Sequence, residues 1–237
     1  MLKIEHVKKF YKNFSLDCSL KVMPGCVTGL IGQNGAGKST TFKAILGLIS
    51  IDEGSISVFG KDIQNFNAED KQNLGVVLSD SGFSGYLTIN DIIPVLDNLY
   101  KNFDKSFFIE QLQRFQLPRN KKIKEFSTGM KAKLKVLVAI SHNAKLLILD
   151  EPTAALDPIQ ESHLYQQYAE ISHGNTTIFI SHRLGSTKLA DTILLIDEGK
   201  ILGCDTHDKL METNLLYNEM FSIQKGWYVN GQEATTT

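Results

Sequence analysis

Val27-Thr28-Gly29-Leu30-Ile31 runs directly into Gly32-Gln33-Asn34-Gly35-Ala36-Gly37-Lys38-Ser39, and this stretch decides the fold. Its first part is β-rich and predicts a strand, and residues 40–48 carry apolar side chains near helical spacing. The glycine-rich part between them satisfies the phosphate-loop pattern in full. A strand, a glycine-rich loop and a helix in this order predict backbone N–H groups that surround a phosphate at the start of the helix.

Each residue of this loop is a candidate nucleotide ligand. Lys38 is expected to reach the β- and γ-phosphates, and the hydroxyl of Ser39 is expected to ligate Mg²⁺. The other expected contacts to the nucleotide come from Gly32, Gln33, Asn34, Gly35, Ala36, Gly37 and Thr40. An incidental glycine turn would not need the flanking strand and helix, so we favour the phosphate-binding interpretation.

A second segment suited to phosphate chemistry is Leu146-Leu147-Ile148-Leu149-Asp150-Glu151. Four apolar residues ending in two carboxylates predict a buried strand that delivers acids to a metal–nucleotide site. Asp150 is expected to hold Mg²⁺ through a water molecule, and Glu151 is expected to polarise an attacking water. The alternative is an acidic strand end that caps the loop starting at Pro152; beside a complete phosphate loop we favour the catalytic role.

The turn Ser127-Thr128-Gly129-Met130-Lys131 precedes a helical pattern and forms a second surface suited to phosphate. Two such surfaces on one chain suggest a nucleotide held between subunits.

The rest of the chain predicts a mostly parallel α/β core with an inserted helical lobe at about 80–140. Strand-like runs occupy residues 2–4, 14–20, 56–59, 176–180, 192–196 and 201–202. Helical patterns cover residues 89–99, 108–115, 134–138 and 160–171, and the second of these should end at Leu117-Pro118. The small polar residues 231–237 are expected to form a flexible tail.

Composition narrows the class of protein. The 237 residues are 42% hydrophobic, and 25 basic and 26 acidic side chains nearly cancel to a net charge of -1. This balance argues against broad electrostatic binding of nucleic acid or of an anionic bilayer.

The cysteines Cys18, Cys26 and Cys204 are scattered, which favours free thiols in a reducing cytosol. There is no signal-peptide pattern and no apolar run of membrane-spanning length, so we expect a cytoplasmic protein without direct membrane insertion.

The glycine-rich loop, the acidic strand and the turn between them resemble the Walker A, Walker B and signature motifs of ABC transporter ATP-binding subunits. The resemblance covers roughly residues 2–210. It implies a P-loop NTPase core with a mostly parallel sheet, an N-terminal antiparallel β subdomain and an inserted helical subdomain. One ATP-binding domain would occupy residues 1–230, with ATP and Mg²⁺ as its cofactors.

The resemblance also implies roles for individual residues. In this family the signature segment contacts the γ-phosphate of the ATP bound by the partner subunit, and Ser127 and Gly129 occupy the matching positions. Asp157 matches the D-loop acid, and His182 matches the switch histidine that senses the γ-phosphate. Tyr11 matches an aromatic residue that stacks on adenine, although Tyr11 could instead belong to the core.

Two positions depart from the family pattern. The usual signature is Leu-Ser-Gly-Gly-Gln, whereas the Ser-x-Gly-Met-Lys form here resembles exporter-type ATPases with a separate permease subunit. The glutamine that usually contacts Mg²⁺ should fall at Ser79. Ser79 offers a shorter hydroxyl, and the neighbouring Asp80 could reach the ion instead. Either water completes the metal shell or the coupling to the membrane partner is tuned differently, and we expect turnover to survive.

The favoured function is an ATP-hydrolysing subunit that powers translocation, with export better supported than import. Its partners would be a multispanning transmembrane permease and a second ATP-binding subunit, in a homodimer or heterodimer that closes head-to-tail. The chain would lie on the cytoplasmic face of the membrane, and a groove near residues 79–88 would receive a coupling segment of the permease. The alternatives are an ATP-switched regulatory module and a soluble ABC ATPase, for example one for cofactor assembly.

Overall fold

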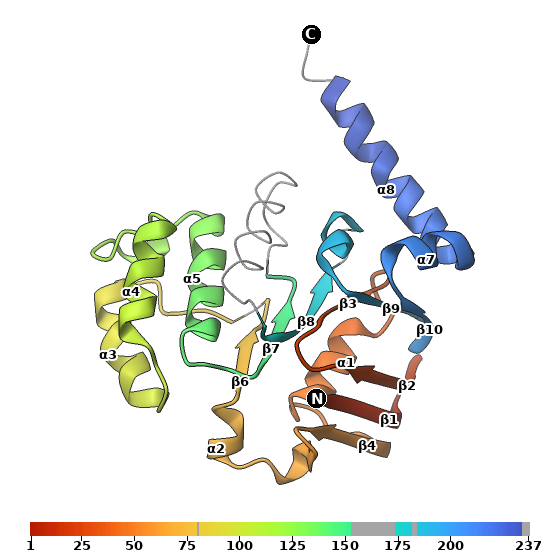
Figure 1. Ribbon diagram of the computed structural model, residues 1–237, viewed down its shortest axis with the longest axis horizontal. Coiled ribbons are helices and arrows are strands. Elements are labelled where there is room, and N and C mark those ends of the chain that lie inside the picture. Colours follow the sequence, from red (N-terminus) through yellow and green to blue (C-terminus); the bar gives the residue numbers. More distant parts are fainter. Residues whose placement is uncertain (80, 153–173, 182–183, 234–237) are drawn as a thin grey trace.

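The protein is described by a computed structural model over residues 1–79, 81–152, 174–181 and 184–233. Figure 1 shows a sheet at the centre, helices α3, α4 and α5 gathered beyond one of its edges, and the strands β1, β2 and β4 toward the other end. The mixed α/β architecture with a mostly parallel sheet, an antiparallel β subdomain and a helical insertion is therefore confirmed.

The central sheet has six strands in the order β10-β9-β3-β8-β7-β6. Their bounds are Val27–Ile31 for β3, Leu74–Val77 for β6, Leu146–Asp150 for β7, Thr176–Ser181 for β8, Thr192–Asp197 for β9 and Lys200–Asp205 for β10. All neighbouring pairs are parallel except β10, which runs antiparallel to β9. Every residue of β7 and β8 is buried, as expected for parallel strands covered on both faces.

The second sheet has four antiparallel strands in the order β2-β1-β4-β5. Their bounds are Leu2–Tyr11 for β1, Phe14–Val22 for β2, Glu53–Val58 for β4 and Lys61–Asp62 for β5. Helix α1, Lys38–Ile45, shares one buried cluster with both sheets, to which it contributes Phe42 and Ile45. The helix begins earlier than the expected residue 40, because Gly37 forms its N-cap in a left-handed conformation.

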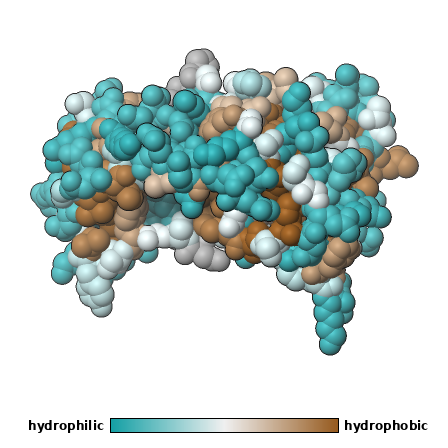
Figure 2. Space-filling view, turned by 90° about the horizontal axis from the view of Figure 1, so that it is seen from below, coloured by the Kyte–Doolittle hydropathy of each residue, from teal (hydrophilic) through white to brown (hydrophobic). Residues whose placement is uncertain are grey.

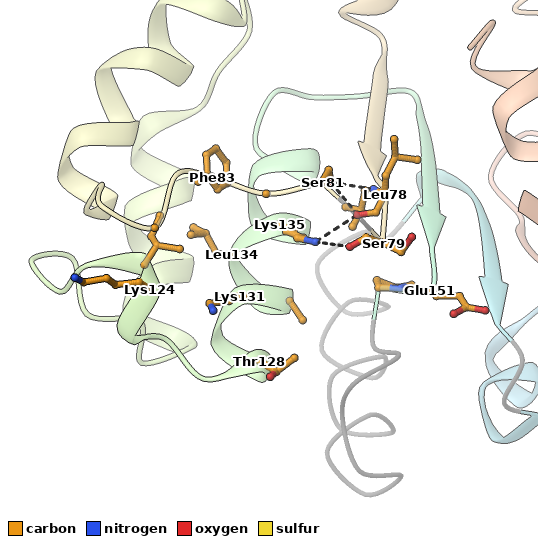
Figure 3. A pocket seen from close by; sticks show the side chains of 16 residues that line it. Leu78, Ser79, Ser81, Phe83, Lys124, Thr128, Lys131, Leu134, Lys135 and Glu151 are labelled. Atoms are coloured by element: carbon orange, nitrogen blue, oxygen red, sulfur yellow. Dashed lines mark hydrogen bonds between the residues drawn. The ribbon is translucent and has the colours of Figure 1, made fainter. Parts of the chain in front are cut away.

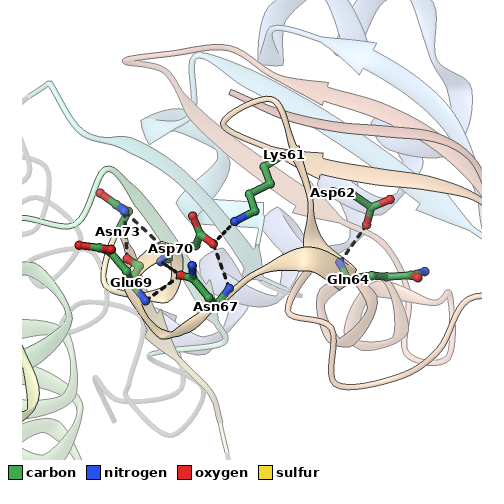
Figure 4. Close-up of polar contacts among 7 residues, drawn as sticks. All are labelled: Lys61, Asp62, Gln64, Asn67, Glu69, Asp70 and Asn73. Atoms are coloured by element: carbon green, nitrogen blue, oxygen red, sulfur yellow. Dashed lines mark hydrogen bonds and ion pairs between the residues drawn. The ribbon is translucent and has the colours of Figure 1, made fainter.

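A short connection leads from the small sheet to β6 and is held by its own polar contacts (Figure 4). It contains the 3-10 helix η1, Ile63–Asn65, and helix α2, Ala68–Lys71. Asn67 and Asp70 form a capping box, and Lys61 pairs with Asp70 across the connection. The hydrogen bond from Lys61 lowers the pKa of Asp70. These contacts fix the approach of the chain to β6, which is followed by the loop that contains Ser79.

The helical lobe consists of α3, Ile89–Leu99, α4, Lys105–Arg114, and α5, Thr128–Ile140, with the 3-10 helix η2, Ile123–Glu125, before α5. Each long helix begins at a side-chain cap, supplied by Thr88, Asp104 and Ser127 respectively. Helix α4 ends before the expected Leu117-Pro118, because Gln116 adopts a left-handed φ of 56°.

Helix α5 lies directly on the edge strand β6. A Cβ added to Gly75 would be 2.3 Å from the carbonyl oxygen of Ala139, so a side chain at this position would separate the two elements. Beyond the end of α5, His142 places its ring nitrogens 3.1 Å from the carbonyl oxygens of Val138 and Leu74. The helix and the strand are thus joined by close packing and by polar contacts.

The C-terminal helices were not predicted. They are α7, His207–Thr213, and α8, Leu215–Glu233, and Figure 1 shows α8 projecting from the body of the protein. Tyr217 anchors them, since it is fully buried and donates to the hydroxyl of Thr187 at 3.2 Å in the 3-10 helix η3, Leu184–Leu189. Helix α8 includes residues 231–233 of the expected tail, and residues 234–237 lie outside the described part. No helix in the described part of the chain is long and apolar enough to cross a membrane.

Candidate functional site

The glycine-rich loop follows the carboxyl end of β3 and closes around Lys38. The Lys38 ammonium is buried and donates to the carbonyl oxygens of Gly32 and Gln33, at 2.8 Å each. Burial lowers the pKa of Lys38, and the carboxylates of Glu151 and Asp150 oppose this shift. The loop therefore holds a lysine whose positive charge is poorly hydrated and close to two acids.

Two glycines of the loop have no room for a side chain. A Cβ at Gly32 would lie 2.1 Å from the carbonyl oxygen of Ile196. Gly37 has a φ of 105°, and a Cβ there would lie 2.9 Å from the Phe14 ring. The loop's middle part and Ser39 are exposed, so their N–H groups and hydroxyl are open to a ligand. This geometry fits a phosphate cradle at the N-terminus of α1.

Asp150 and Glu151 stand at the carboxyl end of β7, on the same edge of the sheet as the loop. Asp150 is buried, whereas Glu151 is partly exposed. Glu151 has a φ of 43°, which is a left-handed conformation that non-glycine residues rarely adopt, and its N–H donates to the Ile180 carbonyl at 3.2 Å. The structure thus brings together Lys38, Asp150 and Glu151, which the sequence places far apart.

Ser79, where the family's glutamine was expected, lies beside the metal-binding candidate Asp150. Its hydroxyl is 3.4 Å from Oδ2 of Asp150. Ser79 and Glu151 also line one cavity of about 480 Å³ that reaches the start of the signature helix at Thr128 (Figure 3). In this view the Lys135 side chain points from α5 toward the backbone of Leu78 and Ser79. Nothing in the sequence pattern indicated this contact of Lys135.

The signature residues lie on the helical lobe rather than on the loop of α1. Ser127 caps α5 by accepting a hydrogen bond from the N–H of Met130 at 3.2 Å. Ser127 and Thr128 are exposed, and Gly129 is partly exposed, at the positive end of a 13-residue helix. The second surface suited to phosphate is therefore open to solvent and is carried by a different element from the first.

Tyr11 ends β1 close to the glycine-rich loop. Its ring centroid is 6.2 Å from that of Phe14, whose ring in turn approaches Gly37. Tyr11 is 48% exposed and the neighbouring Phe10 is 55% exposed, so neither is a core residue. An exposed aromatic ring beside a phosphate loop is available to stack on a base, and this role of Tyr11 stays a prediction.

Three further residues named in the sequence analysis, Asp80, Asp157 and His182, lie outside the described residues.

The donor set fits Mg²⁺. Ser39 offers an exposed hydroxyl, and Asp150 offers a carboxylate. Within the described ranges, no three His, Cys, Asp or Glu side chains form a group that could hold a metal ion by themselves. Mg²⁺ suits such a site, because it is usually held by one or two carboxylates together with substrate phosphates rather than by a protein cage.

Comparisons with known proteins agree with this geometry. A family profile described as "ABC transporter" matches residues 16–154. The lantibiotic transport ATP-binding protein SrtF of Streptococcus pyogenes is 33% identical over 231 residues, which cover 95% of this chain and 99% of SrtF. The linearmycin resistance ATP-binding protein LnrL of Bacillus subtilis is 33% identical over 219 residues, covering 89% of this chain and 70% of LnrL.

A solved structure shows the same fold. It is the dimeric, post-hydrolysis state of an ATP-binding cassette bound to ADP and Pi. It superposes with a TM-score of 0.75 at 19% identity, covering 87% of this chain and 98% of the other.

Proposed function

Because the chain belongs to the ABC transporter family of ATP-binding proteins, we propose that Lys38, Asp150 and Glu151 form the hydrolytic centre of a transport ATPase. The protein binds and hydrolyses ATP to power transport by a transmembrane partner. The observation that carries the assignment of the site is the convergence of these three side chains beside the open glycine-rich loop. Water attacks the γ-phosphate, and ADP and phosphate leave.

Each residue has a role that follows from its position. Lys38 exchanges its hydrogen bonds to Gly32 and Gln33 for contacts with the β- and γ-phosphates. Glu151 orients and polarises the attacking water. Ser39 and Asp150 would hold Mg²⁺, which supplies neutralisation of the phosphate charge. The low hydration of Lys38 strengthens its attraction for phosphate, because ionic interactions are stronger where water is excluded.

A second copy or a related ATP-binding subunit completes the site. Ser127 and Gly129 lie at the exposed start of α5, on the lobe rather than around Lys38. In a head-to-tail dimer they would contact the γ-phosphate bound by the other subunit, with Asp157 at the interface and His182 sensing that phosphate. The solved structure of the same fold is described as dimeric, which is compatible with the pairing of two such subunits.

The transmembrane partner docks on an apolar groove beside β6. This groove of about 420 Å³ is lined by the exposed side chains of Leu48, Val76 and Leu99, together with Tyr100. Figure 2, viewed from below, shows apolar side chains in several patches along this side of the molecule, separated by hydrophilic residues. Leu48 and Leu99 are 59% and 57% exposed, so an amphipathic segment of the partner would bury them. The groove adjoins Leu78, next to the loop where docking was expected.

The direction of transport is export. The relatives' names refer to lantibiotic transport and to linearmycin resistance, and the Ser-x-Gly-Met-Lys signature points the same way. The chain would reside on the cytoplasmic face of the membrane through its partner.

The test is a reconstitution. The chain would be co-purified with the membrane protein encoded beside its gene and placed in liposomes, and phosphate release would be measured with and without Mg²⁺. We expect Mg²⁺-dependent hydrolysis that increases with the transport substrate. An assembled complex that releases no phosphate would contradict the proposal.

A further inference from the structure

Lys135 fastens the signature helix to the loop that carries Ser79. Its ammonium donates to the carbonyl oxygen of Ser79 at 3.0 Å and to that of Leu78 at 3.3 Å (Figure 3). The contact joins α5 to the residues that directly follow β6, which are 56 and 57 positions away in the sequence. A lysine ammonium has three protons, so it can hold two adjacent carbonyl groups at once.

Hydrogen bonds within the loop also hold its backbone. The Ser81 hydroxyl donates to the Leu78 carbonyl at 2.8 Å, and the Leu78 N–H donates to the Ser81 oxygen at 3.3 Å. The Leu78 carbonyl thus accepts from both Lys135 and Ser81. The backbone at Ser79 is therefore held on both sides, by the turn and by the ammonium.

The position of this backbone decides where the Ser79 hydroxyl lies. Serine has a single short side-chain bond beyond Cβ, so its oxygen cannot compensate for a displaced main chain. Here that oxygen lies 3.4 Å from Oδ2 of Asp150. This contact is already long for an O–H···O hydrogen bond, so a shift of the loop away from Asp150 by a few tenths of an ångström would remove it.

The platform that carries Lys135 is itself fixed. Gly75 of β6 allows α5 to pack against the strand backbone, and His142 bridges the other end of the strand at Leu74. Lys135 therefore projects from a helix whose separation from β6 is set independently of the lysine. Removing the ammonium would release the loop while leaving the helix in place.

We propose that Lys135 is a positioning residue of the ATPase site, which holds Ser79 against Asp150 and thereby sets the affinity of the site for Mg²⁺ with ATP. The inference rests on the proposed function, because it takes Asp150 as the metal-binding acid. In this proposal Lys135 acts through the backbone of Leu78 and Ser79, whose carbonyl oxygens its ammonium contacts.

The experiment compares Lys135→Met with Lys135→Arg and Lys133→Met in the full-length chain. Lys133→Met is the matched control: it removes the same charge from the same helix, but Lys133 lies over the Phe115 ring inside the lobe, 5.6 Å from its centroid. The readouts are Mn²⁺ binding with a non-hydrolysable ATP analogue, followed by electron paramagnetic resonance, and the Mg²⁺ concentration that gives half-maximal hydrolysis. The unfolding temperature without ligands reports on a purely structural effect.

We expect Lys135→Met to weaken Mn²⁺ binding and to raise the half-saturating Mg²⁺ concentration by about tenfold, the usual effect of losing a group that orients a ligand. Lys133→Met should leave both unchanged, and Lys135→Arg should retain most of the affinity because it keeps the charged donors. If Lys135 acts through Ser79, adding Lys135→Met to Ser79→Ala should cause little further loss.

Two results would overturn the inference alone: unchanged metal affinity in Lys135→Met, or an undiminished effect of that substitution in the Ser79→Ala background. A fall in unfolding temperature without a change in metal affinity would give the lysine a structural role instead. An unmodified chain that shows no Mg²⁺-dependent ATP binding would overturn the proposed function as well, so the two failures are distinguishable.

Discussion

The hydroxyl of Ser79 lies 3.4 Å from Oδ2 of Asp150, so the loop after β6 meets the acidic end of β7 although the usual glutamine is missing. The distance is long for an O–H···O hydrogen bond, whose usual length is about 2.7–2.8 Å. The contact is therefore weak, and it orients the carboxylate rather than supplying a strong ligand.

Replacing Ser79 should change the Mg²⁺ concentration that the ATPase requires more than it changes the maximal rate of ATP hydrolysis. We expect Ser79→Ala to raise the half-saturating Mg²⁺ concentration by roughly tenfold, whereas turnover at saturating Mg²⁺ falls by less than about threefold. Phosphate release measured across a Mg²⁺ titration tests this. A collapse of turnover at every Mg²⁺ concentration would show that the Ser79 hydroxyl has a direct chemical role.

Glu151→Gln should separate binding from hydrolysis. The amide keeps the size of the side chain but cannot accept a proton from water, so we expect turnover to fall by roughly 10²–10⁴-fold. ATP binding should persist, and an ATP-bound dimer should accumulate on size-exclusion chromatography with light scattering. A variant that binds ATP but stays monomeric would contradict the head-to-tail dimer.

Lys38→Met should abolish the stabilisation of the folded state by bound ATP. In the unmodified protein, ATP at about 100 times its dissociation constant should stabilise the folded state by about 2.7 kcal/mol. Without the ammonium, the phosphates lose their principal cation, and the gain in unfolding temperature on adding ATP should disappear. An equal gain in both proteins would place the nucleotide elsewhere.

Gly75→Ala should destabilise the contact between α5 and β6. The new Cβ would lie 2.3 Å from the Ala139 carbonyl oxygen and 2.5 Å from a methyl group of Leu147. Such overpacking typically costs about 1–3 kcal/mol of unfolding free energy, which urea denaturation would measure. Gly82→Ala is the matched control, since its Cβ would meet nothing closer than the Lys135 side chain at 3.9 Å. Equal losses in both variants would show that the close approach at Gly75 is unimportant.

His207 should make the attachment of the C-terminal helices sensitive to pH. Partial burial lowers the pKa of His207 below its ordinary value of about 6.5; Asp208 opposes the shift and Lys188 adds to it. The unfolded chain therefore takes up a proton before the folded chain does. The contribution of neutral His207 to the free energy of unfolding is therefore complete above about pH 6.5. It is lost as the pH falls toward the pKa that His207 has in the folded chain.

The measurement for His207 is the unfolding temperature at pH 7.5 and pH 5.5. His207→Phe keeps a ring against Tyr217 and Phe221 but cannot be protonated. We expect the unmodified chain to lose more stability than this variant between the two pH values. A larger loss of stability in His207→Phe than in the unmodified chain would show that folding raises the pKa of His207 instead of lowering it.

Features encoded by short stretches of sequence could be predicted. The glycine-rich loop combines a residue pattern with a flanking strand and helix, and the structure places Lys38, Asp150 and Glu151 at one edge of the sheet. The amphipathic spacing of residues 89–99 likewise predicted α3 correctly, because one apolar face suffices to define such a helix.

Features that depend on distant contacts could not be predicted. Helices α7 and α8 were missed, since they are anchored by Tyr217 against Thr187, 30 positions away in the sequence. The contact of Lys135 with the Ser79 carbonyl spans 56 positions and leaves no local pattern. The early end of α4 depends on the left-handed backbone at Gln116, which a glutamine does not indicate.

The left-handed backbone at Glu151 has an evolutionary consequence. Its φ of 43° is costly for a residue with a side chain, by about 1 kcal/mol or more, and glycine would adopt it freely. Glu151→Gly would therefore relieve strain and delete the proposed base in one step. A laboratory screen for heat tolerance alone would tend to enrich inactive proteins at this position, so the glutamate is maintained only where selection acts on turnover.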